Sequence, residues 1–314
     1  MLDYFKYRLR YRFAREWKQS KPVDVTLELA SVCDMGCGYC YHADGNKVPF
    51  TKGFMNFNMA CDIISQAADL DVPAMKFNWK GESTLHPEFF EITEFAKQKA
   101  TKRRLIDRLT NSNFNFKHNR DLILFGLCNQ TKVKISYDSF DKAIFEAQRI
   151  RGEHDVVTKN IDDFYNHPLR KDTQIVIQCV RTKANKDEDF HGLVRKRWPS
   201  CRVSIRDCVD GRRIETDLEI THRKRDFSER QSCIQAHARV IFNHEGIAFP
   251  CCPTVKEDLP IGDIRKQSLI EIWNSPVALS LRDDLKSKKA FERDPCLNCS
   301  SFETFKNYRP SFNS

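Results

Sequence analysis

Apolar and polar residues alternate along residues 23–29, VDVTLEL, and this period of two predicts a β-strand with one buried face. Further strand-like runs follow, separated by longer runs whose apolar residues have a helical period. The strands are predicted over residues 23–29, 74–79, 104–110, 132–137, 174–180 and 202–205. The helices are predicted over residues 57–70, 89–99, 119–127, 141–149, 155–165 and 187–197. This alternation predicts an α/β fold with a parallel sheet.

The two ends of the chain have other patterns. Phe5, Leu9 and Phe13 recur every four residues, which favours an amphipathic helix packed on the rest of the fold or on a partner. Alternation of aromatic and arginine residues in the same segment leaves a strand open, and a helix on a membrane surface is a further alternative. Residues 237–253 predict two short strands joined by a turn at 243–246, and a long helical stretch extends to about residue 288.

Composition restricts the class of protein. The 314 residues suit one large domain or two unequal ones, and 40% hydrophobic with 30% charged residues is typical of a folded chain. No apolar run approaches the roughly 18 residues of a membrane helix, and the basic N-terminus lacks the apolar core of a secretory signal. We therefore expect a cytosolic protein. The 13 cysteines then indicate metal or cluster ligation rather than disulfides.

Three of these cysteines stand together after the first predicted strand. Cys33, Cys37 and Cys40 have the spacing C-x3-C-x2-C. Three thiolates on one tight loop can bind three irons of a [4Fe–4S] cluster and leave the fourth iron open for a cofactor or substrate. A zinc site completed by His42 is the alternative that the spacing leaves open.

This motif, with Tyr39 just before its last cysteine, resembles the signature of the radical S-adenosylmethionine (radical SAM) superfamily. The resemblance implies that Cys33, Cys37 and Cys40 hold a [4Fe–4S] cluster whose open iron chelates SAM. Reductive cleavage of SAM then gives a 5'-deoxyadenosyl radical, which abstracts hydrogen from a substrate. The six predicted strands fit the partial (β/α)6 TIM-like barrel of that family. A one-electron reductant such as flavodoxin or ferredoxin is also implied.

Polar motifs follow the later strands in the order that the family has. KGES, residues 80–83, resembles the GGEP motif, with lysine and serine in place of its first glycine and its proline. The resemblance implies that Gly81 and Glu82 hold the amino end of SAM. It places the other SAM contacts at Tyr39, Asn111, Ser136, Asp138 and Arg151. Arg149 competes with Arg151 as the partner of the SAM carboxylate. The carboxyl ends of barrel strands are where such sites form.

Four further cysteines are grouped in the last third of the chain. They are Cys233, Cys251, Cys296 and Cys299, with Cys252 as a competitor for Cys251. From spacing alone, structural zinc and an iron–sulfur cluster both stay open. The order C, G-x4-C, GDI, EIWNS and C-x2-C resembles the SPASM/twitch extension of radical SAM enzymes. The short form of this pattern implies one auxiliary [4Fe–4S] cluster with a closed four-thiolate shell.

These predictions give a basic amphipathic segment over residues 1–21, a radical SAM barrel over 22–215 and a twitch/SPASM-like domain over 216–314. The formal net charge of +9 falls to about +6 when both clusters are bound, which still favours an anionic substrate. No RNA-binding module is visible, so nucleic acid is not expected as a partner.

The predicted function is hydrogen abstraction from a small polar sugar, cyclitol or nucleotide-like metabolite, followed by oxidation with the auxiliary cluster as electron acceptor. A radical SAM maturase acting on a peptide or protein is the first alternative. A zinc-stabilised nucleic-acid-binding protein is a remote one. The sequence assigns neither the substrate nor a catalytic base.

Overall fold

The computed structural model describes residues 2–40, 42–43, 50–208, 233–254, 256–292, 294–297 and 299. In this part of the chain, nine strands form one sheet in the order β6-β5-β4-β3-β2-β1-β7-β8-β9. The strands are β1 (Asp24–Leu27), β2 (Ala74–Lys76), β3 (Asp107–Ser112), β4 (Lys132–Ser136), β5 (Gln174–Arg181), β6 (Arg202–Asp207), β7 (Arg239–Phe242), β8 (Ile247–Phe249) and β9 (Gly262–Asp263).

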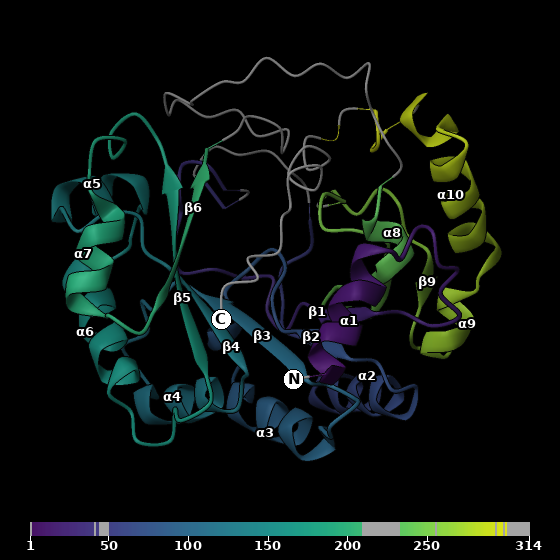
Figure 1. Ribbon diagram of the computed structural model, residues 1–314, viewed down its shortest axis with the longest axis horizontal. Coiled ribbons are helices and arrows are strands. Elements are labelled where there is room, and N and C mark those ends of the chain that lie inside the picture. The colour runs from purple at the N-terminus through teal and green to yellow at the C-terminus, as the bar shows by residue number, and fades with distance from the viewer. Residues whose placement is uncertain are drawn as a thin grey trace.

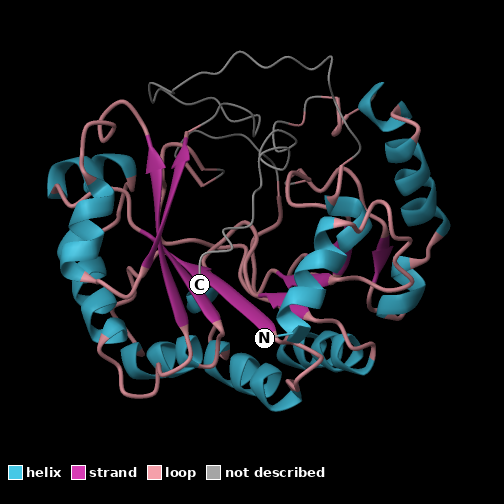
Figure 2. Ribbon diagram, in the orientation of Figure 1, coloured by secondary structure: helices cyan, strands magenta, loops and turns pink. Residues whose placement is uncertain are grey.

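Helices connect the strands and cover the outer side of the sheet (Figure 1). They are α1 (Leu2–Arg12), α2 (Phe57–Asp69), α3 (Phe89–Lys99), α4 (Arg120–Cys128), α5 (Lys142–Gln148), α6 (His154–Tyr165), α7 (Phe190–Arg197), α8 (Gln235–Ala238), α9 (Leu269–Trp273) and α10 (Pro276–Lys286), with short 3-10 turns η1 (Ser83–Leu85) and η2 (Lys289–Glu292). Figure 2 shows that the strands form the inner layer and that α2–α7 lie outside them.

The predicted alternation is confirmed, because β1–β6 pair in parallel and helices connect them. The barrel is partial, as expected. β3 begins at Asp107 rather than at residue 104, because the amide of Thr101 bonds to the Arg104 carbonyl in a turn and Leu105 has a φ of 49°. α7 begins at Phe190 rather than at residue 187, because the Asp189 side chain accepts from the Gly192 amide and caps the helix.

The C-terminal segment continues the same sheet. β7 pairs with β1 in parallel, and β8 and β9 follow in antiparallel pairs. The predicted pair of short strands around the 243–246 turn is confirmed, whereas the addition of β7 to the barrel sheet was not foreseen. The predicted helical stretch to about residue 288 is confirmed as α10, which Ser275 caps and Pro276 begins, and the short helix α9 precedes it. The predicted boundary between residues 215 and 216 lies outside the described residues.

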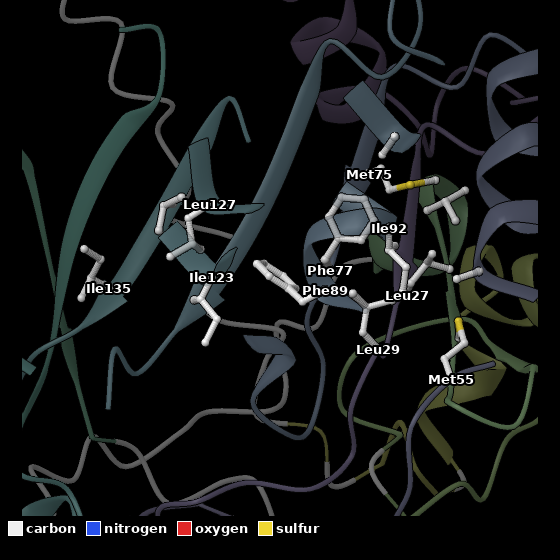
Figure 3. Close-up of a cluster of buried hydrophobic side chains, with 14 of the residues drawn as sticks. Leu27, Leu29, Met55, Met75, Phe77, Phe89, Ile92, Ile123, Leu127 and Ile135 are labelled. Carbon is white, nitrogen blue, oxygen red and sulfur yellow. The ribbon is translucent and has the colours of Figure 1, made fainter. Parts of the chain in front are cut away.

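The core lies between the sheet and its outer helices. Figure 3 shows side chains of the β1 and β2 regions, such as Leu27 and Phe77, packed with Phe89 and Ile92 of α3. Burying a side chain of this size contributes about 1.5–3 kcal/mol. Because side chains alternate along a strand, this outer core places polar residues such as Lys76 on the inner face.

The predicted N-terminal helix is confirmed as α1. Its Tyr7 is buried against Val23, Ala74 and Ala238, which lie at the amino ends of β1, β2 and β7. The Tyr11 hydroxyl accepts a hydrogen bond from Arg239 at 3.2 Å. The helix therefore covers the amino ends of three neighbouring strands. Among the described helices, none is both long and apolar enough to cross a membrane.

Candidate functional site

The first three cysteines lie on the loop that follows β1. Cys37 is buried, Cys33 and Cys40 are half-buried, and the Cys40 amide donates to the Cys37 carbonyl at 2.9 Å. Burial raises the pKa of the Cys37 thiol to about 12; the Arg149 guanidinium opposes this rise and the nearby Cys40 contributes to it. Burial likewise raises the pKa of Cys33. A bound metal stabilises the thiolate form, so a cluster would remove this electrostatic cost.

The KGES loop after β2 lies directly against this cysteine loop. The Glu82 amide donates to the Val32 carbonyl at 2.9 Å. A Cβ on Gly81 would lie 2.3 Å from the Val32 oxygen and 2.5 Å from the Ala30 oxygen. Only glycine allows this approach, so Gly81 sets the distance between the two loops.

Glu82 is a buried carboxylate with fixed partners. One oxygen accepts from the Thr84 amide at 3.1 Å and from the Thr84 hydroxyl at 2.7 Å, and the other accepts from the Asn113 amide at 2.7 Å. Burial raises its pKa to about 7, and the negative charge of Asp34 adds to that rise. An ammonium group beside Glu82 would supply the positive charge that this carboxylate lacks.

Asp34, Asn113 and Asn115 join the site, and the sequence reasoning missed them. The Asn113 side chain donates to one Asp34 oxygen at 2.6 Å, and the Asn115 side chain donates to the other at 3.0 Å. The signal was available in the run NSNFN, where asparagine recurs at every second position from Asn111 onward. The strand ends at Ser112 and Phe114 has a φ of 59°, so the turn after β3, rather than strand alternation, places Asn113 and Asn115 at Asp34.

A second polar group surrounds Asp138, which is fully buried after β4. Its carboxylate accepts from the Tyr39 hydroxyl, from the Val180 amide at 2.8 Å and from Arg149 at 3.0 Å. Arg149 also donates to the Cys37 sulfur at 3.7 Å, and its Nε has no partner among the described residues. The predicted residues Tyr39 and Asp138 are therefore bonded to each other and linked through Arg149 to a cysteine.

Both candidate arginines reach the cysteine loop, from different positions. Arg149 is buried, and its guanidinium donates hydrogen bonds to Asp138 and Cys37. Arg151 is exposed, has a φ of 67°, and donates from Nε to the Asp34 carbonyl at 3.4 Å. Its guanidinium lies so close to Gly36 that a Cβ there would be 2.7 Å away. The exposed position of Arg151 leaves it the better placed of the two to meet a cofactor carboxylate.

Ser136 and Asn111 lie deeper, on the strands themselves. Ser136 pairs in register with Gln178 of β5, and Asn111 pairs with Lys134 of β4. The Asn111 Oδ1 atom is buried without a hydrogen-bond partner. These two residues, which were predicted to contact SAM, lie within β3 and β4 rather than on the loops that follow the strands.

The four C-terminal cysteines line one pocket. Its walls include Cys233, Cys251, Cys296 and Cys299, together with apolar side chains such as Leu281 and Phe291. Burial raises the pKa of Cys233 to about 12, and the neighbouring cysteines add to this rise. Cys252 is not among the lining residues, and its carbonyl accepts from the Trp79 indole at 3.0 Å.

This donor set fits an iron–sulfur cluster chemically. Four thiols in an apolar pocket are costly to ionise, and iron coordination stabilises the thiolates. Within the described residues, no group of three or more His, Cys, Asp or Glu side chains is arranged so that it could hold a metal ion, so the fit to a cluster rests on the chemistry of the four thiols.

Lys80 links the two cysteine groups. Its ammonium pairs with Glu28 at 3.5 Å and with Glu257, which lies six residues after Cys251 of the C-terminal pocket. The same ammonium lies 4.4 Å from the ring centre of Trp79 and 4.8 Å from that of Phe50. The lysine that replaces the motif's first glycine therefore joins the KGES loop to the C-terminal segment.

Comparison with known proteins agrees with this arrangement. Residues 233–300 match the SPASM iron-sulfur cluster-binding domain. The GTP 3',8-cyclase of Actinobacillus pleuropneumoniae serotype 3 is 29% identical over 163 residues, which are 51% of this chain and 44% of that protein. The chain thus spans less than half the length of the curated relatives it matches.

Solved structures show the same fold at low sequence identity. BtrN in complex with AdoMet and 2-DOIA has a TM-score of 0.56 and 14% identity, over 88% of this chain and 92% of that one. Streptococcus suis SuiB bound to S-adenosylmethionine has a TM-score of 0.64 and 14% identity, over 90% and 72%. Native anSMEcpe with bound AdoMet has a TM-score of 0.61 and 16% identity, over 90% and 88%.

The partial barrel is the fold of these solved structures, all three of which were determined with SAM, and the cysteine-bearing C-terminal segment matches an iron–sulfur cluster-binding domain. The chain therefore resembles radical SAM enzymes that carry a SPASM domain, in agreement with the family and the cofactors expected from the sequence. The presence of one auxiliary cluster stays a prediction.

Proposed function

We propose that this enzyme cleaves SAM reductively and oxidises a small polar metabolite, of the sugar, cyclitol or nucleotide type, after hydrogen abstraction. Cys33, Cys37 and Cys40 would hold the catalytic cluster, which leaves one iron for SAM. The bound cofactor supplies a 5'-deoxyadenosyl radical, and the chain supplies position, charge and exclusion of water.

The observation that carries this proposal is the buried Glu82 carboxylate beside the cysteine loop. Thr84 and Asn113 fix its orientation, and the close contact at Gly81 fixes its distance from the loop. A carboxylate held in this way accepts hydrogen bonds from an ammonium and orients the amino end of SAM. Arg151, exposed over the same loop, is the proposed partner of the cofactor's carboxylate.

The C-terminal cysteines have a different proposed role. Cys233, Cys251, Cys296 and Cys299 would complete the coordination of an auxiliary cluster and leave no iron open. Oxidation of a substrate radical releases one electron, and a closed cluster can accept it. The apolar walls of the pocket would limit the access of water to that cluster.

The nature of the relatives supports a small substrate. The matched sequence relatives are named as cyclases of GTP, a nucleotide. Peptide or protein maturation is the second candidate, because SuiB has been solved with a precursor peptide and anSMEcpe with a Cp18Cys peptide. The one-electron reductant and the cytosolic location stay predictions.

The test is anaerobic reconstitution followed by incubation with SAM and dithionite. We expect about eight irons per chain for two cubane clusters, and formation of 5'-deoxyadenosine. Cys33→Ala should abolish 5'-deoxyadenosine formation. Mass spectrometry of metabolite pools incubated with the active enzyme should then reveal a product lighter by two hydrogens.

Cys61→Ala is the matched control, since Cys61 lies on α2 outside both cysteine groups, and this variant should keep full cleavage activity. Zinc without acid-labile sulfide would contradict the proposal and favour the zinc-stabilised nucleic-acid-binding alternative. Persistent SAM cleavage in Cys33→Ala would show that the cysteine motif is misassigned.

A further inference from the structure

The inner face of the sheet carries a cation that the proposed function does not use. On β4, Val133 and Ile135 face outward and belong to the core that includes Ile123 of α4. Because side chains alternate along a strand, Lys134 lies on the opposite, inner face, as Ser136 does. Lys134 is therefore directed toward the inside of the partial barrel.

Lys134 has no hydrogen bond or ion pair to any residue in the part of the chain that the structure describes. The charged groups that act on it are Arg206 of β6, Lys76 of β2, Lys132 of β4 and Asp107 of β3, in decreasing order of effect. Three of these four are cations. Lys134 is half-buried, and an ammonium that is partly removed from water among other cations is stabilised by an anion supplied from outside.

The carboxylates of this face are already matched by other cations. Asp24 pairs with Lys76 and, at 3.1 Å, with Arg239. Asp107 pairs with Lys132 at 3.5 Å. Two carboxylates therefore pair with three cations. No described carboxylate lies within ion-pair distance of Lys134, the next lysine along β4.

An unpartnered acceptor lies beside Lys134. Asn111 of β3 pairs with Lys134 in the sheet register, and neighbouring strands are about 4.8 Å apart. Among the described residues its buried Oδ1 atom has no hydrogen-bond partner, and neither has that of Asn78, which follows the adjacent strand β2. Buried amide oxygens without partners are uncommon in folded proteins and indicate a missing donor.

The position of this pair suits a substrate. Ser136 lies two residues further along β4, about 7 Å toward the carboxyl end, and Asp138 lies beyond it. A ligand held at Lys134 would therefore lie beneath the proposed cofactor contacts, inside the barrel.

We propose that Lys134 and Asn111 form a substrate subsite for an anionic, hydroxyl-bearing ligand: the ammonium binds a phosphate or carboxylate group, and the amide oxygen accepts from a hydroxyl. This inference rests on the proposed function and specifies its substrate class. Burial, with smaller contributions from Arg206 and Lys76, lowers the pKa of Lys134 to about 7, so a bound anion would restore the charged form.

The experiment uses the reconstituted holoprotein and two probes, inorganic phosphate and acetate, each compared with chloride at equal ionic strength. Thermal unfolding of the wild type should shift upward with at least one of the two probes, because an anion that binds the folded state stabilises it. Lys134→Met should lose that shift. Lys159→Met removes an exposed lysine of α6 and should keep it.

The same variant separates binding from a structural role. Methionine has a similar length and no charge, so without anion Lys134→Met should unfold at an equal or higher temperature than the wild type. A shift that persists in Lys134→Met, or no shift with either probe in the wild type, would overturn the subsite. Response to phosphate alone identifies a phosphorylated substrate, and response to acetate alone a carboxylated one.

Failure of this inference can be distinguished from failure of the proposed function. Lys134 touches neither cysteine group, so uncoupled 5'-deoxyadenosine formation should remain in Lys134→Met. Loss of the anion response with cleavage intact supports the subsite, whereas absence of cleavage in the wild type contradicts the proposed function itself.

Discussion

The two cysteine groups of this protein occupy contrasting surroundings. The loop with Cys33, Cys37 and Cys40 lies beside buried polar side chains, including the Glu82 carboxylate and the Arg149 guanidinium. The four C-terminal cysteines line a pocket with apolar walls. The first site has charged groups that can bind a charged cofactor. Among the described residues that line the second, the polar side chains are the thiols and the uncharged Gln235.

This difference indicates a division of labour. A cluster that binds SAM needs an open iron and charged partners for an amino acid moiety. Glu82 and Arg151 adjoin the first group, whereas the described lining of the C-terminal pocket has no Asp, Glu, Lys or Arg side chain. A cluster that only accepts electrons needs full coordination and protection from water. Lys80 connects the two regions through Glu28 and Glu257, so changes at one site can reach the other.

The largest expected effect comes from removing one ligand from each group. Cys40→Ala should reduce 5'-deoxyadenosine formation to background, because the catalytic cluster loses a ligand. Cys296→Ala should keep SAM cleavage and lose conversion of the substrate, because only the electron acceptor is affected. Product analysis by mass spectrometry measures both. Equal loss of SAM cleavage in the two variants would remove the proposed division between the sites.

Glu82→Gln should weaken SAM binding by about 10- to 100-fold, the value of a hydrogen bond to a charged group. Glutamine keeps the size of the side chain and removes its charge. Equilibrium binding of SAM to the reconstituted protein measures the change. Gln98→Glu on the exposed side of α3 changes charge elsewhere and should leave affinity unaltered. Unchanged affinity in Glu82→Gln would remove this carboxylate from the site.

The pH dependence follows from the same residue. Burial raises the pKa of Glu82 to about 7, so SAM affinity should increase as the pH rises through about 7 and the carboxylate ionises. Because the pKa of Glu82 is higher in the folded than in the unfolded protein, the protonated carboxyl stabilises the folded state at low pH. This stabilisation is lost as the pH rises through about 7. Affinity and the stability of the SAM-free protein should therefore change in opposite directions, and Glu82→Gln should show neither trend.

Arg149→Gln should make the reduction potential of the catalytic cluster more negative. The guanidinium donates to the Cys37 sulfur, and loss of a positive donor destabilises the reduced, more negative cluster. A redox titration monitored by electron paramagnetic resonance, without SAM, measures the potential. Arg151→Gln should leave that potential near the wild-type value and weaken SAM binding instead. The reverse result would exchange the roles of the two arginines.

The smallest effect is expected at Cys252. Cys252→Ser should keep the iron content of the wild type, because this residue is not among those that line the C-terminal pocket. Cys251→Ser should lose the auxiliary iron. Iron and sulfide analysis of the two variants tests the choice, and loss of iron in Cys252→Ser would make that cysteine the ligand.

Local sequence was sufficient for most of the elements. The alternation in VDVTLEL and the helical periods predicted β1–β6 and α2–α7, because burial of one face imposes its period on the residues. The predicted start of a strand was wrong where a backbone turn precedes it, as at Leu105 before β3. Cysteine spacing likewise predicted the first group, since ligands on one tight loop are close in sequence, whereas the group of four from separate segments was predicted from the resemblance and lines one pocket in the structure.

Residues brought together from distant segments could not be identified in the same way. The bonds from Asn113 and Asn115 to Asp34 join residues about eighty positions apart, and the pairing of β7 with β1 joins residues more than two hundred apart. Arg149 and Arg151 looked equivalent in the sequence, and only their burial distinguishes them. Nothing in the local sequence distinguishes Lys134 from the other lysines, and only the sheet register shows that it lies beside Asn111.

The sequence by itself determined the ligand types, their spacing and the strand–helix order, because these depend on residues near one another along the chain. The tertiary structure decided which carboxylates are already paired, which arginine is buried and which lysine lacks a counter-charge. Those properties are set by the balance of burial and pairing in three dimensions, and they define the electrostatics of the site.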